Sequence, residues 1–374
     1  MLLGGCAAQP ARVRVAFDAE RITSVQASGL ADRATKRRVT ADDPVRVASV
    51  SKLVVALGVM RLVEAGQLDL DRDVSDYLGW RLRNPAFPNA PITLRLLLSH
   101  RSSLTDGAEY AIPLGETVQG RVANPQAWDA SHAPGTYFRY TNLNFPVVAS
   151  VMERVTGERF DRLMTRLVFV PLKLDAGFNW SGNSDASIAR AVVLYGDKGE
   201  VRRDDLRGKR PDCLVNVAPG VACDLATYRP GDNGALFSPQ GGLRISANGL
   251  ARIGQLFLRH DGAFLKLETM LEFVRDAWSQ EGGQGDTESG FYCSYGLAFH
   301  VLTTWATCRD DLFKDRRRDQ WMGHAGEAYG LRSGLWLNEE RGVAFFATAV
   351  PDSDTGKGKH SAFTPIEERL ARGK

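Results

Sequence analysis

Long hydrophobic runs, metal-binding motifs and an excess of either charge are all missing from this sequence. No run of about 18 apolar residues occurs among the 374, so nothing in the chain as given reads as a membrane-spanning helix. The six histidines show no His-x-His or His-Glu-x-x-His spacing, and Cys-x-x-Cys is also lacking. The net charge is only +3, which is too small to indicate binding to nucleic acid. We therefore expect no metal site, no cofactor and no nucleic-acid partner.

The distribution of elements along the chain predicts an α/β fold of the α+β type. Composition is ordinary for a globular protein, with 44% hydrophobic and 24% charged residues. Strand patterns occupy both ends and helical patterns the middle, so we expect one antiparallel sheet flanked by helices, built from residues 12–79 and 241–374. Residues 80–240 would form an inserted helical lobe, and residues 1–11 a tail. A cleft between the two lobes is the natural place for a ligand.

Several strands and turns can be predicted individually. Residues 13–17 and 22–27 alternate or run as strands around a polar turn, and 334–338 and 343–350 do the same. Both pairs are expected to form hairpins. Residues 295–302 are predicted to form a single strand.

The N-terminal tail carries a possible lipidation site. Residues 3–7 read Leu-Gly-Gly-Cys-Ala, which looks like a bacterial lipobox, although the charged and apolar leader that should precede it is missing. A truncated start would explain this, and Cys6 would then carry a lipid that anchors a periplasmic protein to the membrane. If the start is as given, the protein is expected in the cytoplasm.

The other four cysteines predict two disulfides. Cys213 lies close to Cys223, and Cys293 lies close to Cys308, as expected of bridges formed in an oxidising compartment. The alternative is a set of reduced thiols in a cytoplasmic protein.

The stretch from residue 48 to residue 53 contains Ser49-x-x-Lys52. Apolar residues spaced by three and four follow it as far as Gly66, which predicts a helix with one apolar stripe facing a core. Positions i and i+3 share a helix face, so the Lys52 amine would lie beside the Ser49 hydroxyl. A serine becomes a nucleophile when a neighbouring base takes its proton, and burial can lower a lysine pKa far enough for that role. Chance alone also supplies such a motif in a chain of this length.

Two further stretches could serve the same chemistry. Tyr140-Thr141-Asn142 supplies a phenol that can share a proton with Ser49 and an amide that can bind a substrate carbonyl. His324-Ala325-Gly326 precedes the C-terminal strands and puts small residues where a backbone approaches a substrate closely. Each is weak alone.

Taken together and in this order, the three motifs resemble those of the serine β-lactamase and penicillin-binding superfamily, and more closely its class C β-lactamase, DD-peptidase and family VIII esterase branch. The resemblance covers residues 12–370 and implies a single catalytic domain over 12–374. It implies that Ser49 is acylated, that Lys52 and Tyr140 share the base and acid work, and that Asn142 orients the substrate. Which of Lys52 and Tyr140 takes the first proton stays open.

The resemblance also implies a third group of contacts around the substrate. His324, Ala325 and Gly326 would bind it, and the backbone N–H groups of Ser49 and Glu327 would form an oxyanion hole. β-Lactamases of this branch have a lysine where this chain has His324, and histidine is only partly charged at neutral pH. We therefore expect an esterase-like or D,D-peptidase activity on a small or peptidyl substrate, with β-lactamase as the alternative.

Two other classes of protein are alternatives for this sequence. A binding protein could keep the fold without catalysis, but such a protein has no need for both Ser49 and Lys52. An α/β-hydrolase is the other possibility, and it is excluded because Gly-x-Ser-x-Gly does not occur in the chain.

Overall fold

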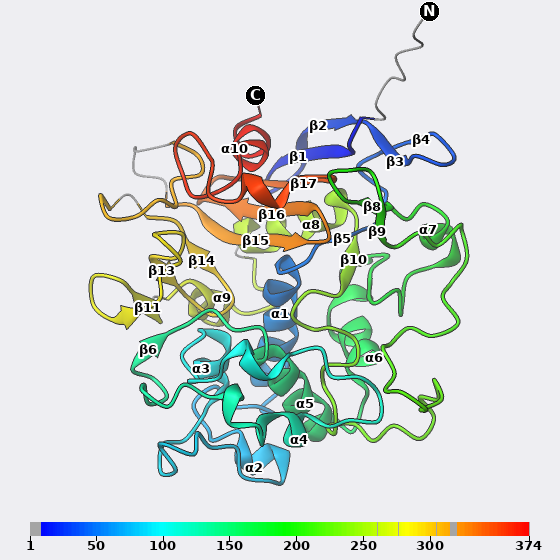
Figure 1. Cartoon of the computed structure of the whole chain (residues 1–374). Helices are drawn as coiled ribbons and strands as arrows, with labels where there is room; N and C mark the ends of the chain where they lie inside the picture. The colour runs from blue at the N-terminus through cyan, green and yellow to red at the C-terminus, as the bar shows by residue number, and fades with distance from the viewer. Residues whose placement is uncertain (1–8, 260, 276, 304, 315–319, 374) are drawn as a thin grey trace, which may run out of the picture.

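The computed structural model describes residues 9–259, 261–275, 277–303, 305–314 and 320–373. Figure 1 shows a broad sheet above a group of helices, with the first and last described residues both near the sheet. The predicted lipidation site at Cys6 lies outside the described residues.

The sheet has eight antiparallel strands in the order β11-β13-β14-β15-β16-β17-β1-β2. Its long strands are β1 (Arg12–Asp18), β2 (Ile22–Ser28), β15 (Met322–Ala328), β16 (Leu331–Leu337) and β17 (Arg341–Ala347). Its short strands are β11 (Trp278–Ser279), β13 (Ser294–Tyr295) and β14 (His300–Val301). The two predicted hairpins, β1–β2 and β16–β17, are confirmed. They join where β1 pairs with β17, with Val15 opposite Ala344, so the two ends of the chain build one sheet.

Helices cover both faces of the sheet. Helix α10 (Pro365–Arg372) packs on one face, while α8 (Ala247–Arg259) and α1 (Val50–Glu64) pack on the other (Figure 1). Strand β16 is therefore buried along its whole length, as expected for a strand with both faces covered. Ser246 caps α8, as its sequence predicts, by accepting a hydrogen bond of 3.0 Å from the N–H of Gly249.

Helix α1 differs from its prediction. An apolar stripe on one face was expected, but the helix is buried on nearly all sides, and even Ser51, Lys52 and Gly58 are inaccessible to water. The reason is its position between the sheet and the remaining helices (Figure 1), so that only Arg61, Val63 and Glu64 near its C-terminal end are partly exposed. A side chain of Lys52 in such a place must lose its hydration.

The prediction of one strand over residues 295–302 is wrong. The chain forms two short strands, β13 and β14, with a turn between them in which Ala298 has a φ of 57°. Gly296 lies in this turn, and a Cβ there would come within 2.1 Å of the Phe273 carbonyl oxygen. Packing against the segment that carries Phe273 therefore bends a sequence that reads as extended.

The remaining helices lie mainly below α1 in Figure 1. They are α2 (Ser75–Leu78), α3 (Leu94–Leu98), α4 (Val118–Val122), α5 (Asn144–Thr156), α6 (Phe160–Met164), α7 (Asp185–Ile188) and α9 (Leu267–Val274). A π-helical turn, Thr165–Phe169, continues α6. The expected class, an antiparallel sheet with flanking helices, is confirmed.

Smaller sheets complete the fold. One has the order β5-β10-β7, and the others pair β3 with β4, β6 with β12, and β8 with β9. Their strands are β3 (Leu30–Asp32), β4 (Arg37–Arg38), β5 (Val45–Arg46), β6 (Tyr137–Phe138), β7 (Gly177–Phe178), β8 (Leu194–Tyr195), β9 (Val201–Arg203), β10 (Leu243–Ile245) and β12 (Gln284–Gly285).

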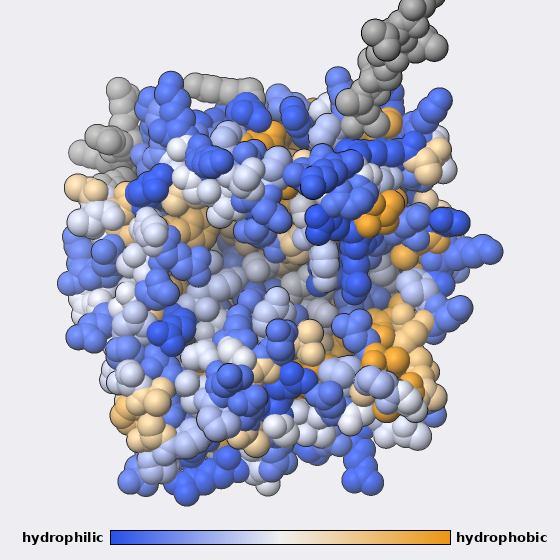
Figure 2. Space-filling model, viewed as in Figure 1, coloured by the Kyte–Doolittle hydropathy of each residue, from blue (hydrophilic) through white to orange (hydrophobic). Residues whose placement is uncertain are grey.

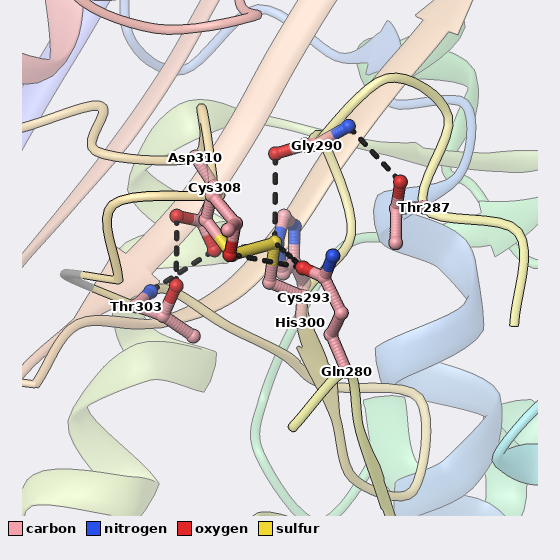
Figure 3. Close-up of a disulfide and its surroundings, with 9 residues drawn as sticks. Gln280, Thr287, Gly290, Cys293, His300, Thr303, Cys308 and Asp310 are labelled. Atoms are coloured by element: carbon pink, nitrogen blue, oxygen red, sulfur yellow. Dashed lines mark hydrogen bonds and ion pairs between the residues drawn. A yellow bond between two sulfur atoms is a disulfide. The ribbon is translucent and has the colours of Figure 1, made fainter. Parts of the chain in front are cut away.

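Both predicted disulfides are present. Cys213 is bonded to Cys223, and Cys293 is bonded to Cys308 (Figure 3). Such bridges favour an oxidising compartment outside the cytoplasm. Within the described ranges, no helix has both the length and the apolar character needed to cross a bilayer. The same part of the chain holds no cluster of three or more His, Cys, Asp or Glu side chains suited to a metal ion.

Candidate active site

Ser49 lies at the point where a short strand turns into the central helix. Strand β5 ends at Arg46, and Val50 opens α1. Between them Ala48 has a φ of 45°, a left-handed conformation that costs a non-glycine residue about 1–3 kcal/mol and persists only where surrounding contacts enforce it. One such contact comes from Ser333, whose hydroxyl donates a hydrogen bond of 2.9 Å to the carbonyl of Val47. Ser49, the predicted nucleophile, is thus held on a tight, fixed turn.

Lys52 is fully buried beside Ser49. Its Nζ lies 3.1 Å from Ser49 Oγ, 2.8 Å from Asn142 Oδ1 and 2.9 Å from the carbonyl oxygen of Gln240. Burial lowers the pKa of Lys52 from 10.5 to about 7, and the negative charge of Asp106 opposes this shift. An amine with such a pKa is about half neutral at pH 7, and its neutral form can accept a proton.

Tyr140 completes the contacts of the Ser49 hydroxyl. Its phenol lies close enough to Ser49 and Tyr292 for both to affect its pKa, and the three residues line the same cleft. Its ring stacks on that of Tyr292 with centroids 5.0 Å apart. Burial raises the pKa of Tyr140 well above its usual value. The phenol therefore keeps its proton at neutral pH and is suited to donate it.

Asp106 orients Asn142. The Asp106 carboxylate accepts hydrogen bonds from Asn142 Nδ2 at 2.9 Å, from Asn142 N at 3.0 Å and from Leu143 N at 2.9 Å. With its amide nitrogen fixed in this way, Asn142 must turn Oδ1 toward Lys52. The last two bonds also satisfy N–H groups at the start of α5, which is where a carboxylate is stabilised by the helix dipole.

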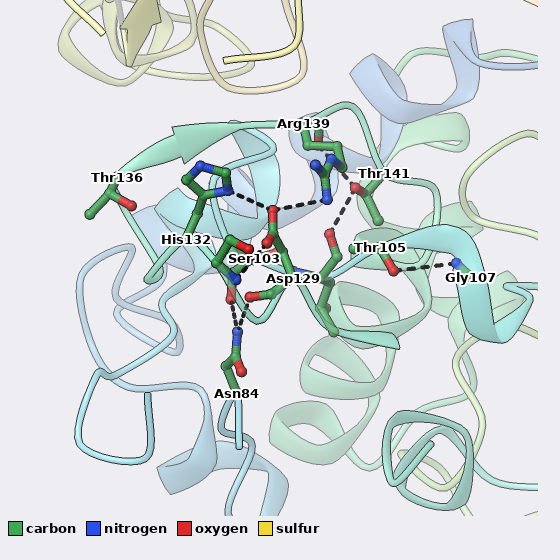
Figure 4. A network of polar contacts seen from close by, with 12 residues as sticks. Asn84, Ser103, Thr105, Gly107, Asp129, His132, Thr136, Arg139 and Thr141 are labelled. Atoms are coloured by element: carbon green, nitrogen blue, oxygen red, sulfur yellow. Dashed lines mark hydrogen bonds and ion pairs between the residues drawn. The ribbon is translucent and has the colours of Figure 1, made fainter. Parts of the chain in front are cut away.

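A network of hydrogen bonds and one ion pair fixes the segment that carries Tyr140 and Asn142. Figure 4 shows Arg139 reaching the Asp129 carboxylate, 2.9 Å away, and Thr141 donating to the carbonyls of Arg139 and Leu104, at 2.9 and 3.0 Å. Asn84 binds the Asp129 carbonyl from the other side, at 2.7 Å. The residues on either side of Tyr140 are thus anchored, and its phenol is preorganised toward Ser49.

Strand β15 passes alongside Ser49. A Cβ on Gly326 would lie only 2.4 Å from the Val47 carbonyl and 3.2 Å from the backbone nitrogen of Ser49. Strand β14 pairs with β15 only at Met322 and Gly323. Among the described strands, none pairs with that edge of β15 beyond Gly323, and Ala325, Gly326 and Glu327 of this stretch line the cleft.

His324 lies behind the cleft, with its ring centroid 6.0 Å from that of Tyr140. Its side chain is 1% exposed and is not among the residues that line the cleft. Burial, together with the charge of Lys52, lowers the pKa of His324 to about 3, so the ring is neutral at pH 7. Its Nδ1 lies 2.6 Å from the Ala325 carbonyl oxygen, and its Nε2 lies 2.9 Å from the Tyr295 hydroxyl. Because a carbonyl can only accept, Nδ1 carries the proton and Nε2 accepts from Tyr295.

A cleft of about 440 Å³ opens onto these residues. Figure 2 shows the face of the molecule seen in Figure 1 hollowed near its middle. Of the predicted site, the cleft is lined by Ser49, Tyr140, Asn142, Ala325, Gly326 and Glu327. The Glu327 side chain forms an ion pair with Arg332 on the neighbouring strand.

Sequence reasoning missed several members of this site. Asp106, Gln240, Tyr292 and Tyr295 all touch the predicted residues, yet no motif includes them. The Asp106-Gly107 pair reads only as a turn, which is one signal that could have drawn attention to it. The disulfide of Cys213 and Cys223 does not line the cleft.

The comparisons with known proteins agree with this geometry. A family model described as Beta-lactamase matches residues 13–356. The chain therefore belongs to the β-lactamase family. It is a serine hydrolase of that family, in which an acyl-enzyme is formed and then hydrolysed.

Individual relatives span several activities. Esterase EstB of Burkholderia gladioli is 31% identical over 336 residues, which cover 84% of this chain and 80% of that protein. The D-alanyl-D-alanine-carboxypeptidase/endopeptidase AmpH of Escherichia coli (strain K12) is 27% identical over 136 residues, or 35% of each chain. The solved structure of EstCE1, a hydrolase with promiscuous acyltransferase activity, has a TM-score of 0.68 at 22% identity and covers 97% of this chain and 93% of that one.

Proposed function

We propose that the protein hydrolyses an ester or an amide through an acyl-enzyme on Ser49. The observation that carries this proposal is the contact of 3.1 Å between Lys52 Nζ and Ser49 Oγ, combined with a Lys52 pKa of about 7. A neutral amine within hydrogen-bond reach of a hydroxyl is an activated Ser–Lys nucleophile.

Lys52 acts as the first base and Tyr140 as the acid. Burial favours the uncharged form of both groups, which leaves Lys52 able to accept a proton and Tyr140 able to give one. Ser49 Oγ attacks the substrate carbonyl as its proton passes to Lys52, and Tyr140 protonates the leaving group when the tetrahedral intermediate collapses. The proton on Lys52 then passes to the Tyr140 phenolate, which restores both groups. Water attacks the acyl carbon as one of its protons passes to Lys52, and that proton is given to Ser49 Oγ when the bond between the acyl group and Ser49 breaks, which releases the acid and regenerates Ser49.

The developing oxyanion is stabilised by the backbone N–H groups of Ser49 and Glu327. Strand β15 runs beside the start of α1, which supports this pairing of donors. Two such donors in a desolvated cleft stabilise the transition state by several kcal/mol, about 3–4 for each donor removed in known cases. His324 acts as a positioning residue, because its Nδ1–H fixes the Ala325 carbonyl on the same strand.

An esterase-like or D,D-peptidase activity fits the site better than β-lactam hydrolysis. The neutral, buried His324 supplies no cation for a substrate carboxylate, whereas the family's β-lactamases carry a lysine there. The chain is 31% identical in sequence to esterase EstB over most of the length of both proteins, which supports an esterase-like activity. The alternative from a different class of protein is a non-catalytic binding protein that keeps the fold.

Labelling of Ser49 tests the proposal. A fluorophosphonate is expected to add one phosphonyl group to the wild type, seen by intact mass, and none to Ser49→Ala. Ser51→Ala is the matched control, because Ser51 lies on the same helix but its hydroxyl accepts from Leu243 N at 3.1 Å and is buried. A wild-type protein left unmodified by both a fluorophosphonate and a labelled penicillin would favour the binding protein. Rates with 4-nitrophenyl butyrate, nitrocefin and a D-Ala-D-Ala peptide then rank the substrates.

Asp106→Asn is expected to shift the pH profile. With Lys52 as the base, kcat/KM of the wild type rises with pH around a midpoint near 7. The Asp106 charge stabilises the Lys52 ammonium, so its removal lowers the lysine pKa and moves the midpoint to lower pH. The loss of Asn142 orientation lowers the plateau by about tenfold. Asp129→Asn would serve as a control that disturbs the same region without touching Asn142, and an unmoved midpoint in Asp106→Asn would contradict the assignment.

We further propose that the protein is periplasmic and anchored through a lipid on Cys6. The two disulfides support a location outside the cytoplasm. The lipobox-like residues 3–7 support the lipid anchor. Mass spectrometry of the N-terminal peptide from cells would detect the lipid, and an unmodified cysteine would contradict it.

A further inference from the structure

Glu288 is a carboxylate without a partner in the wall of the active-site cleft. It lines the cleft together with Ser49 and Tyr140. Within the described part of the chain, its carboxylate accepts no hydrogen bond and meets no cation at ion-pair distance. Glu288 is exposed to solvent in the cleft, while the packing around its carboxylate and the nearby Asp286 raise its pKa to about 7. An acidic group held in such surroundings is stabilised by any cation that reaches it.

The loop that carries Glu288 is fixed in an unusual conformation. Glu288, Ser289 and Gly290 have φ values of 46°, 59° and 87°, and left-handed backbone at two consecutive non-glycine residues is a conformation that surrounding structure must enforce. The Gly290 N–H donates to Thr287 Oγ1 at 3.2 Å, and its carbonyl accepts from Arg309 N at 2.8 Å. The disulfide of Cys293 and Cys308 closes the same loop, as Figure 3 shows.

The loop that carries Glu288 lies on the Tyr140 side of the site. Phe291 N donates to the Glu288 carbonyl at 3.3 Å and Tyr292 N to the Thr287 carbonyl at 2.9 Å, and the Tyr292 ring stacks on that of Tyr140. All three residues, Glu288, Tyr140 and Tyr292, line the cleft. Tyr140 is the proposed proton donor to the leaving group. A group that leaves from Ser49 toward Tyr140 therefore moves toward Glu288.

Aromatic rings line the cleft around this position. Phe291, Tyr292 and Phe363 all line the cleft, and the Phe291 ring lies 4.8 Å from Tyr292 and 4.7 Å from Phe363. Aromatic faces attract ammonium groups, most of all together with a carboxylate. A neutral or anionic leaving group would gain nothing from Glu288.

The other charged side chains in the cleft already have partners or hydrogen bonds. Arg332 is paired with Glu327, and Glu367 accepts from Thr364 Oγ1 at 2.7 Å. The guanidinium of Arg309 donates to the carbonyl of Gly356 at 3.2 Å. Among the carboxylates that line the cleft, Glu288 is thus the one left for a ligand.

We propose that Glu288 and the adjoining aromatic rings bind a positively charged leaving group, of the primary or quaternary ammonium class, and so set the substrate preference of the enzyme. This inference rests on the proposed function, since it assumes that the leaving group departs on the Tyr140 side.

Two isosteric esters test the preference. Acetylcholine and 3,3-dimethylbutyl acetate share an acyl group and a leaving-group shape and differ in charge. The wild type is expected to give the higher kcat/KM with acetylcholine, and Glu288→Gln to lower the ratio of the two values by about tenfold. Glu281→Gln is the matched control, because Glu281 is an exposed acid of the same region that does not line the cleft. A ratio that is the same in Glu288→Gln and wild type would overturn the proposal.

A binding measurement separates this inference from the proposed function. On Ser49→Ala, calorimetry is expected to show tighter binding of choline than of 3,3-dimethylbutanol, with the difference lost when Glu288→Gln is added. Equal binding of the two alcohols would overturn the inference whether or not the wild type turns over esters. Failure of the fluorophosphonate to label Ser49, with choline still preferred, would instead overturn the acyl-enzyme proposal alone.

Discussion

Lys52→Met is expected to lower kcat/KM for ester hydrolysis by about 10³-fold, because it removes the general base while filling nearly the same volume. The Ser49 hydroxyl would keep Tyr140 as a partner but would have no group able to take its proton at pH 7. Lys198→Met, which removes an exposed lysine that lies in a turn and does not line the cleft, should leave kcat/KM unchanged.

The stability of Lys52→Met distinguishes a catalytic role from a structural one. The folded-state pKa of about 7 lies below the unfolded value of 10.5, so the unfolded chain binds more protons between these pH values and the lysine costs stability there. That cost is complete below pH 7 and disappears as pH rises to 10.5. Replacing Lys52 removes it, so the melting temperature at pH 7 should not fall. A lower melting temperature together with lost activity would point to misfolding and contradict the assignment.

Gly326→Ala is expected to lower kcat/KM by about 10²-fold and also to lower the melting temperature. The added Cβ would lie 2.3 Å from Ser333 Oγ and 2.4 Å from the Val47 carbonyl oxygen. Strand β15 would have to move away from the turn before Ser49, which separates the two proposed oxyanion donors.

A second glycine supplies the control for Gly326→Ala. A Cβ on Gly241 would meet backbone atoms of Ala48 at 3.7 to 3.8 Å, an ordinary van der Waals distance, and Gly241 is also next to the nucleophile turn. Gly241→Ala should keep most of the activity. Equal losses in the two variants would mean that proximity to Ser49, and not the collision with β15, decides the effect.

Much of the fold could be predicted from local features of the sequence. The hairpins at residues 13–27 and 334–350, the cap at Ser246 and the two disulfides are fixed by patterns a few residues long, and the structure confirms them. The prediction of a single strand over residues 295–302 was wrong, because the bend in this segment depends on contact with Phe273. That residue lies outside the short stretch of sequence from which a strand is predicted. The division into lobes at residues 80 and 240 stays a prediction.

The site shows the same division between local and long-range information. Ser49 and Lys52 could be paired from the sequence because a helix brings positions three apart together. The partners that tune them are distant in the chain: the carbonyl of Gln240 is 188 residues from Lys52, and Asp106 is 36 residues from Asn142. No periodicity links such positions.

The sequence alone determined the family and predicted the chemistry at Ser49, because its three motifs and their order indicate the reacting groups. Only the tertiary structure decided the charge of those groups. The burial of Lys52 on α1 lowers its pKa, and the burial of His324 on β15 makes its ring neutral at pH 7. The fixed loop that carries Glu288 places this residue in the wall of the cleft. The physical reason is that ionisation depends on desolvation and on neighbouring charges, both of which arise when distant segments pack together.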